Sequence, residues 1–439
     1  MARKAKKLIE LGEKLEGHVI DEIEKVDVVV LEELSERLNE ISDPRDEAYV
    51  RHKLGDIIMI TLFAVLTNAN EWLEVEVFGK KNKTWLQKFL ELPYGIPTDD
   101  TYRTVFSRLN VNFVYHLIVG FLKKKFDAIL NVFSGHEIEK KDTEKDLLSC
   151  DGKVSKSSKR NETDNAGTKA LNTLNAYSSD WGMCVDQEFI KEKTNEIPAM
   201  PILLSRLNLE NTIVTWDALN TQKETVQAVI SGGGDYVGAL KGNHEKLFAD
   251  VQAYFDEKRM TTIEQEDNDR EKKQYKKTEE EEHSATVTRE YYIEPQIEWL
   301  NGREDWEGLK AVGVVVITKK KKGTDDVTTE TRYYICSITD IDDFERAARG
   351  HWGVENGLHW HLDFTFKDDK NTTKKGNGAE GLQIIKKIAL SLLKVVQVLY
   401  PPRTSLKIIR YRLSLDFVNE IERIFTALNA DAIKEAFSM

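Results

Sequence analysis

In the segment Leu147-Leu148-Ser149-Cys150-Asp151-Gly152-Lys153, a short apolar run is followed directly by an acid, Asp151. A second run, Thr212-Ile213-Val214-Thr215-Trp216, ends in the same way at Asp217. Further strand-like runs occupy 170–177, 183–190 and 236–240, and helical patterns occupy 196–207, 222–230 and 244–255. Three strands followed by alternating helices and strands predict a mixed sheet that is covered by helices.

Three acids stand out because of where they lie along the chain. Asp151 and Asp217 end two of the apolar runs, and Glu355 lies in the segment Arg349-Gly350-His351-Trp352-Gly353-Val354-Glu355-Asn356. Side chains at strand ends leave the packed layer and reach solvent, so ligand sites gather there. Three such carboxylates predict a pocket for Mg²⁺ or Mn²⁺, and two ions about 4 Å apart assist phosphodiester displacement. Taken singly, each acid has an alternative role as a strand cap or as a partner of lysine.

The first third of the chain is predicted to be all helical. Apolar residues recur at helical spacing, with a turn at 93–97 and Thr98 as the expected N-cap of the next helix. The two short helices around this turn resemble a helix-turn-helix, with Arg103 and Arg108 on the second; helical scaffolding is the alternative interpretation. The predicted helices cover 20–41, 54–66, 84–92, 99–109 and 113–133.

The second half of the chain begins with a segment, 256–284, that is dense in both charges and is predicted to be a solvated loop or a frayed helix. The pattern that follows predicts a helix from Asp342 to Phe364 and a last strong helix over 379–399, which Pro401 and Pro402 stop. Strands are predicted at 285–293, 309–318 and 331–338, with a basic hairpin tip at 319–322.

Length and composition limit the classes of protein that the chain can belong to. Its 439 residues suggest two or three domains, and 40% hydrophobic against 31% charged residues predicts folded structure. No apolar run reaches the length of a membrane span, and three widely spaced cysteines exclude a disulfide framework, so we expect a cytoplasmic protein without membrane contact. The net charge of −12 argues against a nucleic-acid binder, but phosphate contacts need only local basic patches.

Several segments recur in an order that is more specific than any single motif. The segments are Asp43-Pro44-Arg45, Gly95-Ile96-Pro97-Thr98-Asp99-Asp100-Thr101, Asp151-Gly152-Lys153, Lys193-Thr194-Asn195-Glu196-Ile197, Asp217-Ala218-Leu219-Asn220-Thr221-Gln222-Lys223, Gly233-Gly234-Asp235-Tyr236-Val237-Gly238-Ala239-Leu240-Lys241-Gly242-Asn243 and the Arg349 to Asn356 segment. Together they resemble the H-repeat-associated family of bacterial insertion-sequence transposases, over about residues 40 to 395.

The resemblance implies a fold, an activity and a set of partners. The fold is an α/β, RNase H-like mixed sheet flanked by helices, with an all-helical N-terminal domain and a β-rich insertion before the last catalytic acid. The activity is DNA transposition, in which transposon ends are cut and the 3′-hydroxyl is joined to target DNA, with Asp151, Asp217 and Glu355 as the metal triad. The cofactors are two Mg²⁺ or Mn²⁺ ions, and the partners are double-stranded DNA and further copies in a homodimer or larger assembly. The alternatives are a DDE-fold nuclease without strand transfer and an inactive DNA-binding remnant.

The same reasoning divides the chain into five parts. They are a helical N-terminal domain (1–135), the first part of the RNase H-like core (145–256), a charged loop and β-rich insertion (257–340), the last part of the core with the third acid (341–400) and a helical tail (401–439).

Residues near the triad are candidates for DNA contact. Arg349 and Lys241 are phosphate clamps or structural ion-pair partners, and Trp352 with Trp360 would stack on an unpaired base or pack in the core. The complete set of DNA-binding candidates is Lys153, Lys241, Asn243, Arg349, His351, Trp352, Asn356, Arg103 and Arg108.

The triad glutamate also belongs to a helical stripe of possible metal ligands. His351, Glu355 and His359 follow one another at steps of four residues, so a zinc site is the alternative interpretation of this stripe. Buried, hydrogen-bonded histidines are a further alternative. Asp363 is the substitute ligand if Glu355 does not fill that role.

Overall fold

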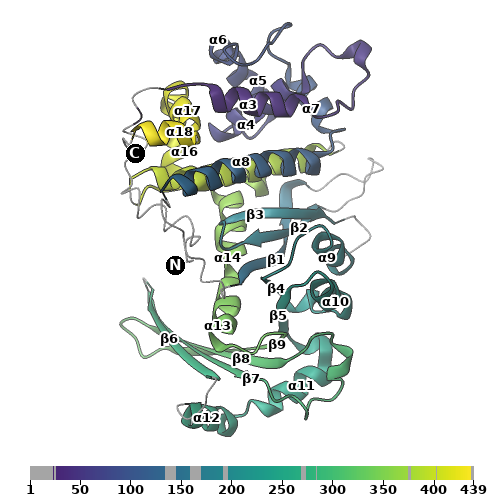
Figure 1. Ribbon diagram of the computed structural model, residues 1–439, viewed down its shortest axis with the longest axis vertical. Helices are drawn as coiled ribbons and strands as arrows, with labels where there is room; N and C mark the ends of the chain where they lie inside the picture. Colours follow the sequence, from purple (N-terminus) through teal and green to yellow (C-terminus); the bar gives the residue numbers. More distant parts are fainter. Residues whose placement is uncertain are drawn as a thin grey trace.

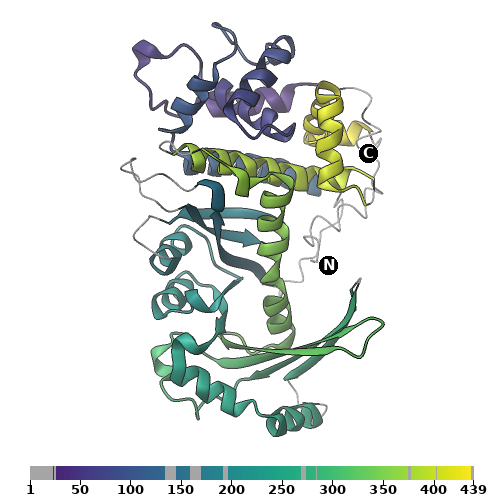
Figure 2. The same cartoon turned by 180° about the vertical axis from the view of Figure 1, so that it is seen from behind.

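The computed structural model describes residues 23, 26–133, 145–158, 170–190, 196–267, 273–282, 284–373, 377–401 and 403–436. Residues 193–195 of the Lys193 to Ile197 segment lie outside this part of the chain, as does most of the expected boundary at 135–145. Figures 1 and 2 show a helical layer at one end, a large sheet below it, and one long segmented helix that runs across the sheet.

The helical layer is built around a helix that is apolar on all sides. Every residue of α4 (Leu54–Leu66) is buried, as expected for a helix without a polar face. Its neighbours are α3 (Val29–Asn39), α5 (Trp72–Lys81), α6 (Lys83–Leu86), α7 (Asp99–Phe106) and α8 (Val111–Phe133).

The tail helices pack back onto this layer. Phe417 and Phe425 both contact the ring of Phe63 in α4, and the Trp85 indole donates a hydrogen bond of 2.7 Å to Glu422. The tail therefore shares the hydrophobic core of the front end. Its helices are α16 (Leu406–Leu415), α17 (Phe417–Thr426) and α18 (Ala430–Ala436).

Five strands form the central part of the sheet in the order β3-β2-β1-β4-β5. β1 pairs with β2 and β2 with β3 in antiparallel fashion, whereas β1, β4 and β5 run parallel to one another. This is the RNase H-like arrangement of three antiparallel strands extended by two parallel ones, and it confirms the predicted fold class. The strands are β1 (Asp146–Ser155), β2 (Leu171–Ser178), β3 (Met183–Phe189), β4 (Thr212–Trp216) and β5 (Asp235–Leu240).

The predicted β insertion continues the same sheet. β9 pairs antiparallel with β5, and β8, β7 and β6 follow outward, which gives nine strands in one sheet. The strands expected at 285–293, 309–318 and 331–338 are confirmed. The strands of the insertion are β6 (Tyr275–Glu281), β7 (Ala285–Glu294), β8 (Ala311–Lys321) and β9 (Val327–Cys336).

The prediction of a loop or frayed helix over 256–284 is wrong in part. The segment forms helix α12 (Glu257–Glu266) and the edge strand β6. β6 is stable despite its charges because they are paired across the sheet: Lys277 bonds to Glu290 on β7, and Glu280 pairs with Arg289. The charged residues of β6 therefore form ion pairs with oppositely charged residues of β7, and the charge density of the segment did not indicate a loop.

Alternating side chains on the strands build two cores on opposite faces of the sheet. Leu148 and Val214 pack with helices on one face, and Leu147 and Ile213 pack with a helix on the other. The first face is covered by α9 (Glu196–Leu204), α10 (Lys223–Ser231) and α11 (Glu245–Tyr254), and the second by α13 (Ile341–Gly350) (Figure 1).

The helix predicted from Asp342 to Phe364 is confirmed, and its second half is wider than an α-helix. α13 is followed by α14 (Trp352–Val354) and then by two π-helical segments, Glu355–His359 and His361–Thr365. Widened turns of this kind are frequent at functional sites. A buried helix, α15 (Gly378–Val396), then passes beneath α8 and ends before Pro401.

Within the described ranges, no single helix combines the length and the apolar character needed to cross a membrane. Asp99–Phe106 and Val111–Ile129 meet this criterion only as a pair, and they are bent by 96° at their junction.

Candidate active site

The two aspartates lie next to each other on the parallel strands β1 and β4. The last paired residues of these strands are Cys150 and Trp216, so Asp151 and Asp217 follow at the same level of the sheet. Asp151 does not end its strand as expected, because β1 continues to Ser155 and Asp151 pairs with Asn175 of β2. β4 ends at Trp216, so Asp151 has no paired residue of β4 beside it. Asp217 caps the short helix Ala218–Asn220.

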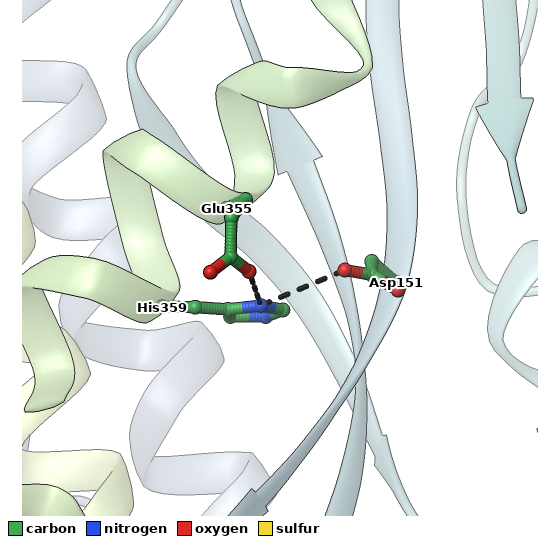
Figure 3. A group of neighbouring side chains, drawn as sticks. All are labelled: Asp151, Glu355 and His359. Carbon is green, nitrogen blue, oxygen red and sulfur yellow. Dashed lines mark hydrogen bonds and ion pairs between the residues drawn. The ribbon is translucent and has the colours of Figure 1, made fainter. Parts of the chain in front are cut away.

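The segmented helix brings Glu355 and His359 to Asp151. Ligand atoms of these three residues lie within 4.8 Å of one another, a spacing suited to a bound metal ion. His359 Nδ1 lies 3.1 Å from Glu355 Oε2 and 3.6 Å from Asp151 Oδ2 (Figure 3). The imidazole is buried, whereas 54% of the Glu355 side chain is exposed. The expected convergence of a helix glutamate on a strand aspartate is therefore present.

The carboxyl groups of the site perturb one another. Burial, together with the nearby charges of Asp217, Glu196 and Glu355, raises the pKa of Asp151 to about 7. The hydrogen bond from His359 lowers the pKa of Glu355, while burial lowers the pKa of His359. A buried acid among other acids is stabilised by a proton or by a cation, so this arrangement fits a divalent metal.

The sequence reasoning missed Glu196 as a residue of the site. Its Oε2 accepts a hydrogen bond of 3.1 Å from Asn220 Nδ2, and the same nitrogen lies 3.0 Å from Asp217 Oδ1. Burial and the charge of Asp217 raise the pKa of Glu196. Its position in the quoted Lys193 to Ile197 segment was the only available signal, because nothing local indicates that α9 begins beside β1.

Gly152 gives Glu196 the room to approach Asp151. A Cβ atom on Gly152 would lie 2.1 Å from Glu196 Oε1, far inside van der Waals contact. A side chain at residue 152 would therefore force the Glu196 carboxylate to move away from Asp151.

Two of the residues predicted to contact DNA are paired with acids of the protein. The Lys153 ammonium is buried and lies 2.5 Å from Asp363, and Arg349 Nη2 lies 2.8 Å from Glu280 on β6. Arg349 therefore fulfils its alternative role as an ion-pair partner. Asp363 therefore pairs with Lys153, whereas Glu355 joins the group of atoms around Asp151.

The remaining predicted DNA contacts are mostly exposed side chains. Lys241 is exposed, and Asn243 Nδ2 donates to the Ala218 carbonyl next to Asp217. Asn356 is exposed beside Glu355. Trp352 is 42% exposed and lies under the Arg332 guanidinium at 4.7 Å, so it is not a core residue.

His351 lies on the side of the helix that faces the sheet. Its Nδ1 is 3.1 Å from Thr215 Oγ1 of β4, and burial lowers its pKa to about 4. His351 thus holds the helix against the sheet and does not join Glu355 and His359 in a common ligand set. The cysteines Cys150, Cys184 and Cys336 are buried free thiols.

The predicted helix-turn-helix is incomplete. The first helix, expected over 84–92, is only the four-residue α6, too short for a supporting helix. α7 buries Tyr102, Val105 and Phe106 in the front-end core. Arg103 pairs with Asp99 and Asp100, whereas Arg108 is exposed. The scaffold interpretation is favoured, and DNA contact by Arg103 and Arg108 stays a prediction.

Comparison with known proteins gives family matches over most of the described fold. Residues 139–392 match the family described as "Transposase DDE domain", and residues 35–121 match "DDE_Tnp_1-associated". The chain is 32% identical to "Putative transposase YncI" of Escherichia coli O157:H7, over 83% of this chain and 88% of that protein. It is 29% identical to "H repeat-associated putative transposase YhhI" of Escherichia coli strain K12, over 83% and 90%.

A solved structure, a piggyBac transposase synaptic complex with hairpin DNA, aligns with a TM-score of 0.33 and 11% identity. The alignment covers 96% of this chain and 81% of that one, but so low a score supports no functional argument.

The RNase H-like sheet and the domain match define a transposase of the DDE class, an enzyme. The matched domain spans more than half of the sequence. The chain belongs to the H-repeat-associated family of DDE transposases, as the resemblance of its motifs implied.

The contact between Gly152 and Glu196 predicts coupled effects on stability. Gly152→Ala is expected to lower the free energy of unfolding by roughly 1–3 kcal/mol, because the new methyl group overlaps the Glu196 carboxylate. Combining it with Glu196→Ala removes the overlap, so the double variant recovers much of this loss in urea unfolding. Strictly additive losses in the double-mutant cycle would contradict the contact.

The raised pKa of Asp151 predicts how stability depends on pH. Between about 4, the value for an unfolded chain, and about 7, the folded protein holds this proton while the unfolded chain does not. Stability therefore falls as pH rises through this window. In metal-free protein, Asp151→Asn is expected to be more stable than the parent at pH 8, by on the order of a few kcal/mol, and nearly equal at pH 4. Thermal unfolding measures the difference, and Asp431→Asn, at an exposed acid on α18, is the matched control; equal stability of Asp151→Asn and parent at pH 8 would contradict it.

Proposed function

We propose that this transposase cuts the ends of an insertion sequence and transfers the freed 3′-hydroxyl to target DNA, with Asp151, Asp217 and Glu355 as its catalytic acids. The observation that carries the proposal is the gathering of acids from β1, β4 and the segmented helix around the half-buried carboxyl group of Asp151, whose pKa is raised. Structural acids are normally paired with bases; here Asp151 faces other acids.

The residues present fit a site for divalent cations such as Mg²⁺ or Mn²⁺. Asp151, Asp217 and Glu355 supply hard oxygen ligands, and the mutual repulsion that raises the pKa of Asp151 is relieved by a cation. Two such ions, when bound, activate the attacking oxygen and stabilise the leaving oxygen of a phosphodiester.

The protein groups around the acids position them and the DNA. The Gly152 amide donates to Asp151, Asn220 donates to Asp217, and His359 lies in hydrogen-bond contact with Glu355, so each acid has an orienting partner. Lys241, Asn243, Trp352 and Asn356 lie at the rim of the site, where double-stranded DNA is expected to pass. Lys153, Arg349 and His351 are expected to act through the residues that they contact.

The assembly that acts on DNA is expected to be a homodimer or larger, because two transposon ends must be held together. The helical front end and tail, which share one core, are the expected additional DNA-contacting body. The five-part division of the chain remains a proposal on the same footing.

Removing one carboxylate charge at a time tests the assignment. Asp151→Asn and Glu355→Gln are each expected to lower Mg²⁺-dependent cleavage of a transposon-end duplex by more than about 10³-fold, because each removes one negative charge from the metal site. DNA binding, measured by fluorescence anisotropy, is expected to stay within a few-fold of the parent. Glu304→Gln, which alters an exposed acid paired with Arg303, is the matched control for loss of one charge.

A joining assay separates this function from its two alternatives. The proposed transposase yields covalently linked target DNA from a pre-cut end. Cleavage without joining would indicate a DDE nuclease, and binding without either reaction or metal uptake would indicate a DNA-binding remnant. Cleavage that is unchanged in either variant would remove that residue from the catalytic set.

A further inference from the structure

A buried hydrogen-bond chain leads from α15 through β2 to the helix that carries Glu355. Lys387 Nζ lies 2.5 Å from Asn175 Oδ1, Asn175 Nδ2 lies 3.3 Å from His359 Nε2, and His359 Nδ1 lies 3.1 Å from Glu355 Oε2. Lys387, Asn175 and His359 are all buried. The three side chains come from elements far apart in sequence, so the fold alone creates the chain.

The lysine fixes the orientation of the Asn175 amide. An ammonium group only donates hydrogen bonds, so the atom of Asn175 that faces it is the carbonyl oxygen. The contacts of the amide nitrogen independently support this orientation. Its Nδ2 lies 3.0 Å from the Thr173 carbonyl oxygen and 3.4 Å from that of Asp151, and only an N–H group is favourable there. Asn175 Nδ2 carries two hydrogens: one serves the Thr173 carbonyl oxygen, and the second is shared between the Asp151 carbonyl oxygen and His359 Nε2, so an N–H of Asn175 faces His359.

The asparagine in turn fixes the tautomer of His359. An amide nitrogen has no lone pair to accept a hydrogen bond, so His359 Nε2 must be the acceptor and carry no proton. The imidazole then bears its proton on Nδ1. That N–H points at Glu355 Oε2 and is the donor of the 3.1 Å hydrogen bond (Figure 3).

This proton location excludes the most obvious role for His359. Its Nδ1 lies in the group of atoms with metal-ligand spacing. A ligating imidazole uses the lone pair of one nitrogen and donates its other N–H to an acceptor, but here the other nitrogen faces an N–H donor. Coordination through Nδ1 would require the two N–H groups of Asn175 and His359 to oppose each other in a buried space.

We propose that His359 is a positioning residue, held with its proton on Nδ1 by Lys387 and Asn175, and that it orients the Glu355 carboxylate without binding metal itself. The proposal rests on the proposed function only in taking Glu355 as a catalytic acid. Glu355 needs such a donor because its side chain is half exposed and lies on a widened helical turn. Keeping the imidazole out of the ligand set also preserves an all-oxygen site, which favours Mg²⁺ over zinc.

The tautomer can be measured on metal-free protein without DNA. In protein labelled with ¹⁵N-histidine, long-range ¹⁵N–¹H correlation spectra are expected to show His359 Nδ1 protonated and Nε2 unprotonated. His359→Asn identifies the resonances by removing them. A protonated Nε2 in the parent protein overturns the proposal, whether or not the protein cleaves DNA.

Replacing the donor that faces His359 Nε2 by an acceptor should move the imidazole proton from Nδ1 to Nε2. Asn175→Asp places an oxygen beside Nε2 and keeps a partner for Lys387, so His359 Nε2 is expected to become protonated. The matched control is Gln187→Glu, which adds the same charge at the second acceptor of Lys387 but does not contact His359. The proposal is supported if His359 Nε2 becomes protonated in Asn175→Asp but not in Gln187→Glu. It is overturned if Nε2 becomes protonated in both variants or in neither.

Rescue by a conservative variant separates positioning from ligation. The amide side chain introduced by His359→Asn offers an N–H near the place of Nδ1 but no imidazole lone pair. We therefore expect His359→Ala to lose about 10- to 100-fold in Mg²⁺-dependent cleavage and His359→Asn to recover most of it. Loss in both variants equal to that of Glu355→Gln, with folding intact by circular dichroism, would indicate a ligand and overturn the proposal.

Discussion

The structure depends on holding several negative charges close together in a partly buried place. Asp151 lies among Asp217, Glu196 and Glu355, and burial makes each of these charges harder to tolerate. No single element supplies this cluster: two parallel strands, the start of α9 and the segmented helix each bring one acid. The hydrogen bonds from Gly152, Asn220 and His359 offset part of the repulsion between the carboxylates. A bound cation would neutralise the remaining repulsion.

Much of this could be predicted from the sequence, because the deciding signals were local. The apolar runs before Asp151 and Asp217 marked two strands, and the pairing of β1 with β4 then set the two acids side by side. Glu196 could not be found in this way, since its role depends on where α9 begins in space. His359 was predicted either as part of a zinc stripe or as a buried, hydrogen-bonded histidine, and it is buried and hydrogen-bonded. Its role towards Glu355 could not be predicted, because it depends on Asn175, 184 residues earlier.

The errors have a common physical origin in long-range pairing. β6 was expected to be a loop because its charges suggested solvent, yet Glu290, Arg289 and Arg349 on other elements match them. The same pairing explains how basic residues are used in this acidic chain. Lys153, Arg103 and Arg349 were candidates for DNA contact, and each forms an ion pair with acids of the protein. The sequence around a residue gives the charge of its side chain but does not show which distant residue forms an ion pair with it.

The ion pair between Arg349 and Glu280 has a mechanical consequence. Glu280 lies on β6, the outermost strand of the sheet, and Arg349 lies on the helix that continues to Glu355. Because that helix is packed on the sheet through Phe344 and Ile341, the ion pair attaches the outermost strand of the insertion to the same segmented helix that carries Glu355. A molecule that displaced the outermost strand would therefore also strain the helix close to Glu355.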